Sequence, residues 1–573
     1  MQLRRHLERR DSEGYAIIMS MVLSGVSLLL LSAALSWTST SAVQTQRNNE
    51  FFNSGSAAEA ATDKVLSAIS QSYQTHDESE VYTQLSSFQN MVPTRSEDPN
   101  WANYEFSDAQ GRVGSTYVSR ITPWAWGELP AGYSSMKGYR ATYRIVSNAK
   151  LLKSANQKSV SALKREVGLV SIPVFEFGIF FAIDLEFNPA DTWNVSGPVH
   201  ANSMIYVEPN RTLTFSNKVT STQKIVHDRS PGDPINRSAK PIYYLNGRVE
   251  GVKSLNLPLG VPNSPENLRQ IVELPPMGES PTSPMGRQRY YNKADLNILV
   301  SDTSVVAKSG AYNNFAITIP WSTISTFLRT NIVFFDKRES VDIQATEIDI
   351  VAFNARITTL TSLLGRQPKT LYINDSRTQS SLTKPGVRLV NGNLLPAGGL
   401  SVATPNPLYV KGDYNHPTMV VKGQTVPDPS KRVGASLISD AFTYLSNDWI
   451  DADSTKSLTT RDVKKTATLN AGIITGLVPS GGGYYSGGVE GTIRFLEYWG
   501  SRTMAFSGSL VVLYPSKIAT SPWGATSDVY ELPTRSWRWD TTFLEPSKLP
   551  PATPELRAVV RSQWSTLAPN TLN

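Results

Sequence analysis

Residues 14–46 read GYAIIMSMVLSGVSLLLLSAALSWTSTSAVQTQ and carry no charged side chain. As an α-helix, residues 15–37 would be about 34 Å long, enough to cross a hydrocarbon core of about 30 Å. Four arginines and three acidic residues precede this run in MQLRRHLERRDSE, residues 1–13. Because positive charge stays on the cytoplasmic side, we expect the amino end inside the cell and the remaining chain outside it.

Three interpretations of the apolar run are consistent with these residues. It could be a secretory signal peptide cut after Ala42, a plain uncleaved anchor, or a prepilin-like segment behind a leader, residues 1–14. The apolar part of a signal peptide is only about 7–15 residues long, which is shorter than this run. The short charged leader that ends in a small residue favours cleavage between Gly14 and Tyr15.

The helical pattern continues past the apolar run, over residues 38–71. Small or apolar side chains recur there at steps of four and three, at Phe51, Gly55, Ala58, Thr62, Val65 and Ile69. Such a stripe is one face of an amphipathic helix. The sequence therefore predicts one continuous helix whose first half lies in the membrane and whose second half packs on protein.

This region resembles the amino-terminal part of PilX-type minor pilins. The resemblance covers about residues 10–70 and includes Arg47-Asn48, Phe51-Phe52 and Ala58-Glu59-Ala60. It implies processing by prepilin peptidase at Gly14 and Tyr15. It also implies other pilins or minor pilins and the bacterial inner membrane as partners.

The sequence departs from most pilins at Met19. Most pilins have Glu at this position, and in the family that Glu is thought to pair with the amino terminus of a neighbouring subunit during assembly. A carboxylate in hydrocarbon is expensive unless it is paired, so it persists where assembly needs it. The departure favours a sparse or tip position over the filament shaft.

The exported region reads as mainly β. Alternating apolar and polar residues predict antiparallel strands within 72–170. The apolar run 167–187 contains Pro173 and acidic residues, so it predicts buried strands and not a second membrane span. Residues 193–199, 213–219 and 243–249 repeat one short pattern around a Gly or Asn turn, which predicts stacked coils of a β-solenoid; a β-meander with coincidental spacing is the alternative.

The segments expected from these patterns cover the whole chain. They are a prepilin-like leader 1–14, a transmembrane helix 15–37, a periplasmic helix extension 38–71, an α/β or β-rich segment 72–170, β-solenoid repeats 171–252, a Pro-rich surface excursion 253–310, and a β-rich continuation with a C-terminal cap 311–573.

Composition excludes several classes of chemistry. The chain has 573 residues, no cysteine and five histidines, so disulfides, thiolate sites and HExxH-type pairs are absent from the sequence. The net charge of +7 is mild for this length and indicates no nucleic-acid partner. Asp448, Asp451 and Asp453 are weak calcium candidates, because the Gly and Glu of an EF-hand loop are missing. We expect no cofactor, no metal and no enzymatic activity.

Longer stretches of sequence resemble those of a bacterial group of proteins that joins a PilX-type amino terminus to a β-helical exported domain. These stretches include residues 399–415, 486–514 and 533–564. The resemblance implies a single-pass inner-membrane protein whose carboxyl-terminal region lies in the periplasm or on a pilus. The expected function is that of a minor pilin in type IV pilus or pseudopilus assembly, at the tip or in adhesion. A K-type pseudopilin of a type II secretion system and an anchored β-helix adhesin or carbohydrate-active protein remain alternatives.

Overall fold

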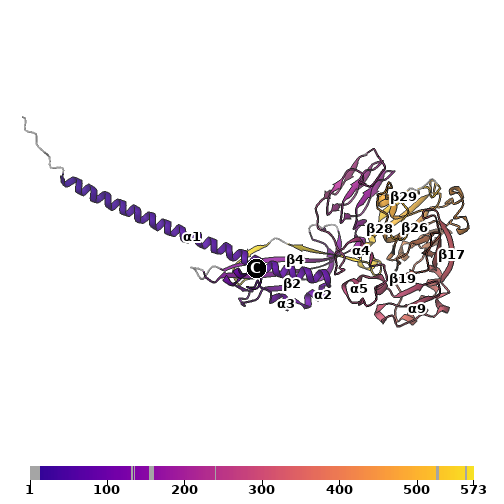
Figure 1. Ribbon diagram of the computed structural model, residues 1–573, viewed down its shortest axis with the longest axis horizontal. Coiled ribbons are helices and arrows are strands. Elements are labelled where there is room, and N and C mark those ends of the chain that lie inside the picture. Colours follow the sequence, from indigo (N-terminus) through magenta and orange to yellow (C-terminus); the bar gives the residue numbers. More distant parts are fainter. Residues whose placement is uncertain are drawn as a thin grey trace, which may run out of the picture.

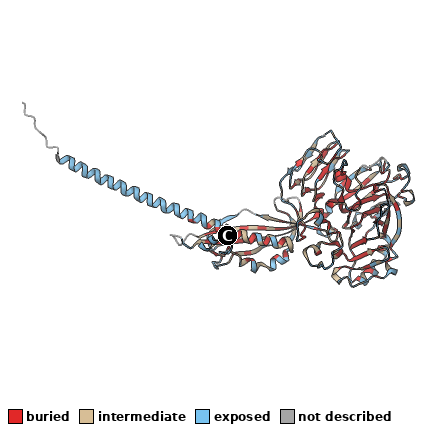
Figure 2. Cartoon of the chain, viewed as in Figure 1, coloured by how far each residue is buried: buried red, intermediate tan, exposed pale blue. Residues whose placement is uncertain are grey.

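The computed structural model describes residues 13–130, 133, 136–153, 160–238, 240–523, 528–561 and 564–572. Its longest element is helix α1, Glu13–Thr75, of 63 residues. Figure 1 shows its first half projecting from the body of the molecule, and Figure 2 shows that half exposed along its length. Within the described residues this is the one helix long and apolar enough to cross a membrane. The predicted continuous helix is confirmed, and most of the leader, residues 1–12, lies outside the described residues.

The second half of α1 packs on an antiparallel sheet, the helix-bound sheet. Its order is β1-β3-β4-β30, with β2 paired to β3 and β31 paired to β4. Its elements, with two short helices beside it, are β1 (Tyr104–Ser107), β2 (Tyr117–Glu128), β3 (Lys137–Leu151), β4 (Val160–Pro173), β30 (Glu555–Arg561), β31 (Ser565–Leu567), α2 (Glu78–Thr83) and α3 (Leu85–Gln89). The antiparallel strands expected in 72–170 are confirmed.

The predicted helix stripe faces this sheet for most of its length. Ala58, Thr62, Val65 and Ile69 are fully buried, whereas Phe51 at the start of the stripe is 47% exposed. Burying one Val or Ile side chain contributes about 1.5–3 kcal/mol. The stripe therefore attaches the helix to the sheet from about Ser54 onward.

The first stack follows the helix-bound sheet and consists of short parallel strands. They are β5 (Ile179–Phe181), β6 (Leu185–Phe187), β7 (Trp193–Val195), β8 (Val199–Ala201), β9 (Ile205–Val207), β10 (Leu213–Phe215), β11 (Val219–Ser221), β12 (Ile225–Val226), β13 (Ile242–Tyr244) and β14 (Arg248–Val249). They stand in three parallel columns, β7-β10-β13, β6-β9-β12 and β5-β8-β11-β14. A closed β-solenoid stays a prediction.

The first two copies of the sequence repeat stack in the predicted register. Phe215 lies opposite Val195, and Val219 lies opposite Val199. Gly197 takes the expected positive φ of 84°. At the equivalent turn the side chain of Asn217 instead accepts a hydrogen bond from the Gly197 amide, at 2.9 Å.

The predicted register of the third copy is wrong by one residue. Phe215 pairs with Tyr244 and not Leu245, and Val219 pairs with Arg248 and not Val249. A slip of one residue turns a strand side chain to the opposite face. Leu245 is accordingly 65% exposed.

The second stack forms the rest of the body. Its elements are α4 (Pro265–Arg269), α5 (Pro284–Gln288), α6 (Tyr290–Lys293), β15 (Leu296–Val300), β16 (Val305–Ser309), α7 (Trp321–Ile324), β17 (Leu328–Asp336), β18 (Val341–Asp349), α8 (Ile350–Ala355), α9 (Ile357–Leu364), β19 (Thr370–Asp375), β20 (Thr383–Val390), β21 (Leu400–Ala403), β22 (Leu408–Lys411), β23 (Thr418–Val421), β24 (Gln424–Pro427), β25 (Ala435–Ser439), β26 (Phe442–Leu445), β27 (Ala467–Leu477), β28 (Thr503–Pro515) and β29 (Thr534–Trp539).

The two stacks share one twelve-stranded sheet. Its order is β14-β11-β8-β5-β28-β27-β25-β21-β19-β15-β16, with β29 paired to β28. The stacks meet where β28 pairs in parallel with β5, with Leu510 opposite Ile179. The chain enters this sheet at β5 and adds strands outward as far as β14 at one edge. It then continues with β15 and β16 at the opposite edge and adds strands inward until β28 pairs with β5. The prediction of a β-rich body that follows a long amino-terminal helix is confirmed.

Two expectations about the later segments are wrong. Residues 253–310 were expected at the surface, yet Leu255, Leu257, Leu268 and Ile271 are buried in a core shared with the helix-bound sheet and the large sheet. The apolar residues between the prolines fill this junction. The carboxyl-terminal residues do not cap the stack either, because β30 and β31 return to pair with β4.

We predict that Phe215→Ala lowers the free energy of unfolding by about 3–5 kcal/mol, since it empties a packed position between Phe187 and Tyr244. Leu245→Ala, at the exposed position, is the matched control and should change stability by less than about 0.5 kcal/mol. Urea unfolding of the full chain in lipid nanodiscs, followed by circular dichroism, measures both. Equal losses for the two variants would contradict the observed register.

Candidate functional site: the apolar half of helix α1 and its anchorage

The candidate site is the exposed half of α1. Every described side chain from Gly14 to Asn49 is exposed. The large apolar residues among them include Ile17, Ile18, Met19, Leu23, Leu28, Leu29, Leu30, Leu31, Leu35 and Trp37. A continuous apolar surface of this length is stable only in a bilayer or against other apolar helices. One long apolar helix of this kind is compatible with a single-pass membrane anchor.

The predicted processing residues lie at the free end of this half. Gly14 has no neighbouring atom within 4 Å of where a side chain would begin, and Tyr15 is 79% exposed. Met19 is 61% exposed. The peptide bond between Gly14 and Tyr15 is therefore not covered by any described part of the chain.

Polar contacts from β4 hold α1 where the packed half begins. The Ser161 hydroxyl donates to the Phe51 carbonyl oxygen at 2.8 Å. Arg165, whose side chain is 9% exposed, donates to Glu59 at 3.3 Å and also pairs with Asp63. Because one buried guanidinium serves two carboxylates on successive turns of the helix, it fixes the rotation of α1 as well as its distance from the sheet.

A second arginine holds the carboxyl end of α1. Arg557 on β30 donates to the carbonyl oxygen of Tyr73 at 2.5 Å and to that of His76. The last carbonyls of a helix have no partner within the helix and carry its negative end, so a cation is stabilising there. Burial lowers the pKa of Arg557 from its ordinary value.

The turn after α1 is fixed by a buried carboxylate. Glu78 is 4% exposed. It accepts a hydrogen bond from the Tyr143 hydroxyl at 2.5 Å and one from Arg120 at 3.0 Å. Burial, followed by the bond to Glu78, raises the pKa of Tyr143, which therefore remains a donor at neutral pH.

The weak calcium candidates do not converge on one point. Asp448 accepts from the Lys464 amide, Asp451 pairs with Arg388 at 2.6 Å, and Asp453 pairs with Lys456 at 2.5 Å. In the described part of the chain, no group of three or more His, Asp or Glu side chains could hold a metal ion.

Three tryptophans of the carboxyl-terminal region, Trp523, Trp537 and Trp539, are dispersed. Trp537 packs against Trp193 and Phe506, where β29 lies beside the first stack. Trp539 donates to the Phe175 carbonyl oxygen at 3.0 Å. Trp523 instead contacts Tyr485, in the Gly-rich loop 481–488. These rings close the junction between the stacks and do not form one exposed aromatic platform.

Sequence reasoning did not find Arg165, Glu78 or Arg557. Their partners are far away in the chain; Arg557 and Tyr73 are 484 residues apart. No local motif marks such a pair, and only covariation between the two ends of the chain could have signalled it.

Comparisons with known proteins place few limits on this chain. No protein-family model matches it, and no curated protein matches its sequence. Among solved structures, the competence-associated pilin ComZ from Thermus thermophilus aligns over 90% of this chain and 98% of its own, with 10% sequence identity and a TM-score of 0.28. A likeness at that TM-score establishes neither the fold nor the function of this chain.

We predict that Arg557→Met loosens the carboxyl end of α1. The loss of a charged hydrogen bond to a buried carbonyl corresponds to roughly ten-fold faster amide exchange over residues 66–76. Arg95→Met, which removes an exposed cation of the same region, should leave this exchange unchanged. Hydrogen–deuterium exchange mass spectrometry of the full chain in nanodiscs reads both. Unchanged exchange in Arg557→Met would show that the arginine does not hold the helix.

Proposed function

We propose that this chain is a pilin-like structural subunit, anchored in the bacterial inner membrane and exported, that joins a type IV pilus or pseudopilus through the first half of α1. One observation carries the proposal. The helix is a single element of 63 residues whose first half has exposed side chains throughout its described length, while its second half packs on an antiparallel sheet. This division suits a subunit that moves from a bilayer into a bundle of like helices without refolding its body.

The physical requirement is the same in both environments. Apolar side chains on all sides of the first half must be kept from water. A bilayer satisfies them before assembly, and the apolar helices of neighbouring subunits satisfy them afterwards. The pilins and minor pilins that supply those helices, and the peptidase that would free the helix end, are the proposed partners.

A minor, PilX-type position at or near the tip fits the chain better than the shaft. Met19 supplies no carboxylate for a neighbour's amino terminus. The body beyond the helix-bound sheet is large, and two joined stacks repeated at every subunit would crowd a helical filament. The 20-residue spacing between paired residues of the first stack supports a β-solenoid body. That body would serve assembly or adhesion, and we assign it no catalysis.

The first test is the mature amino terminus. We predict cleavage between Gly14 and Tyr15, read by amino-terminal sequencing of membrane-extracted protein. Gly14→Trp should block cleavage, because a bulky side chain would not fit beside the catalytic groups of the peptidase. Gly25→Leu, at a second open glycine of the same apolar segment, should be cleaved normally. A mature chain that begins at Val43, or one that retains Met1, would reject the prepilin assignment.

A further inference from the structure

A cavity of about 290 Å³ lies where the helix-bound sheet meets the first stack. Tyr133 and Met136 enter it from the loop before β3, and Val559, Val560 and Arg561 enter it from β30. The opposite wall comes from Phe177, Pro198, His200, Lys218 and Thr220, and from the segment Val252, Lys253 and Leu255 that leaves β14. Its size falls near the lower end of the range for small-molecule sites.

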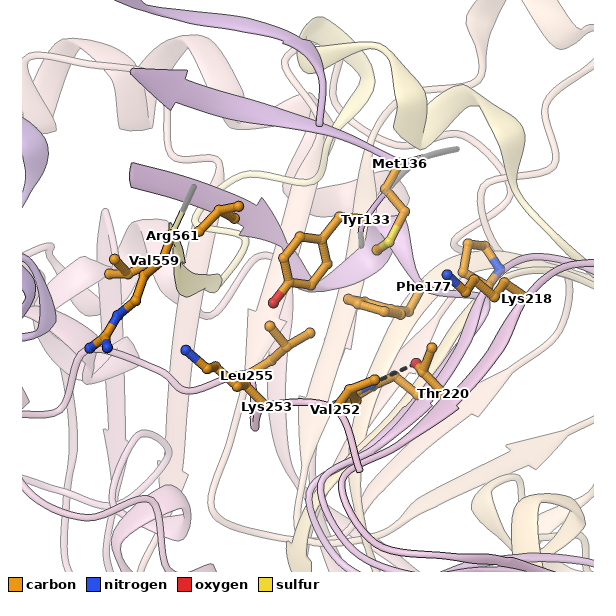
Figure 3. A pocket seen from close by; sticks show the side chains of 13 residues that line it. Tyr133, Met136, Phe177, Lys218, Thr220, Val252, Lys253, Leu255, Val559 and Arg561 are labelled. Atoms are coloured by element: carbon orange, nitrogen blue, oxygen red, sulfur yellow. Dashed lines mark hydrogen bonds between the residues drawn. The ribbon is translucent and has the colours of Figure 1, made fainter. Parts of the chain in front are cut away.

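Most of the lining is apolar, and three of its side chains are buried. Met136, Phe177 and Leu255 are buried at 5%, 2% and 1% exposure. In Figure 3 these side chains and Val252 lie around the ring of Tyr133. Such walls favour an apolar body in the cavity, since apolar surface leaves water on binding.

The lining also carries three cations and no acid. Lys218, Lys253 and Arg561 line the cavity, and no Asp or Glu does. Within the described part of the chain, none of these three head groups forms a salt bridge. In Figure 3 the Lys253 amine and the Arg561 guanidinium lie on the same side of the cavity as the Tyr133 hydroxyl. That side of the cavity is therefore positively charged and rich in hydrogen-bond donors.

His200 does not add to or cancel this charge. Its Nδ1 lies 2.8 Å from the Thr220 hydroxyl and its Nε2 lies 2.9 Å from Asn202 Oδ1. Asn202 Oδ1 also accepts from the Leu255 amide, so it is the acceptor and His200 Nε2 is the donor. Burial lowers the pKa of His200 to about 4, so the ring is neutral at physiological pH. The imidazole serves as a fixed, uncharged part of the wall.

We propose that this cavity binds a medium-chain fatty carboxylate, with its head group at Lys253, Arg561 and Tyr133 and its acyl chain against Phe177, Met136 and Leu255. The charge of the lining selects an anion, and the apolar walls select a hydrocarbon body. Because the walls belong to both the helix-bound sheet and the first stack, a bound ligand stabilises the arrangement of these two parts.

The test is calorimetric titration of octanoate into the full chain in nanodiscs, with empty nanodiscs titrated identically. We expect saturable binding at one site per chain, and no binding of octylamine, which reverses the charge. Octyl phosphate binding more tightly than octanoate would assign the cavity to a phosphate-bearing lipid and overturn the carboxylate. Heats equal to those of empty nanodiscs would overturn the site itself.

Three variants locate the binding. Lys253→Met and Arg561→Met keep the aliphatic stem and should each raise the octanoate Kd about ten-fold, the effect of one charged hydrogen bond. Val252→Trp fills the cavity and should abolish binding while the circular dichroism spectrum stays unchanged. Lys465→Met, at an exposed lysine away from the cavity, is the control. Equal affinity in all of these variants would place octanoate elsewhere on the protein.

Discussion

The packing of α1 on strands β3 and β4 is the contact on which the rest of the structure depends. Three alanines of the helix, Ala57, Ala58 and Ala61, are buried against Ala149 and Leu163. The small alanine side chains of the helix let it approach the sheet closely, and larger ones, such as Val65 and Ile69, fill the space further along. Since the side chains of the first half of the helix are exposed, this packing and the polar contacts of Arg165 and Arg557 fix how the helix sits on the exported region.

The carboxyl end of the chain completes that attachment. Strand β30 adds to β4 and brings Arg557 to the end of the helix. Figure 1 shows the carboxyl terminus beside the helix-bound sheet, although the two stacks lie between β4 and β30 in the sequence. The stacks are in effect a long insertion into one sheet. A structural subunit can carry such an insertion as a head, because strand β30 returns to complete the sheet that holds the helix.

The sequence predicted the features that depend on local spacing. The continuous helix, the burial of Ala58, Val65 and Ile69, and the first two repeat copies follow from periods that a short window contains. The third copy was misaligned at Leu245, because the loop before it changes length and a one-residue slip leaves the apolar pattern almost unaltered. The return of β30 and the pairing of Leu510 with Ile179 depend on contacts hundreds of residues apart, which no local pattern encodes. The leucines of the Pro-rich segment were wrongly expected at the surface. Proline disfavours regular strands, but it does not prevent the apolar residues between prolines from being buried.

The helix residues proposed as the functional site were accessible to sequence reasoning because hydrophobicity and length define a membrane segment directly. The arginines that orient the helix, Arg165 and Arg557, were not, since each contacts residues far from it in the sequence. In the proposed function, α1 places this chain in a filament as a rare subunit. Quantitative mass spectrometry of sheared filaments measures that most directly. We predict that the processed chain is present at a small fraction of the major subunit. Its absence from filaments, or an amount near one copy per major subunit, would contradict the proposed function.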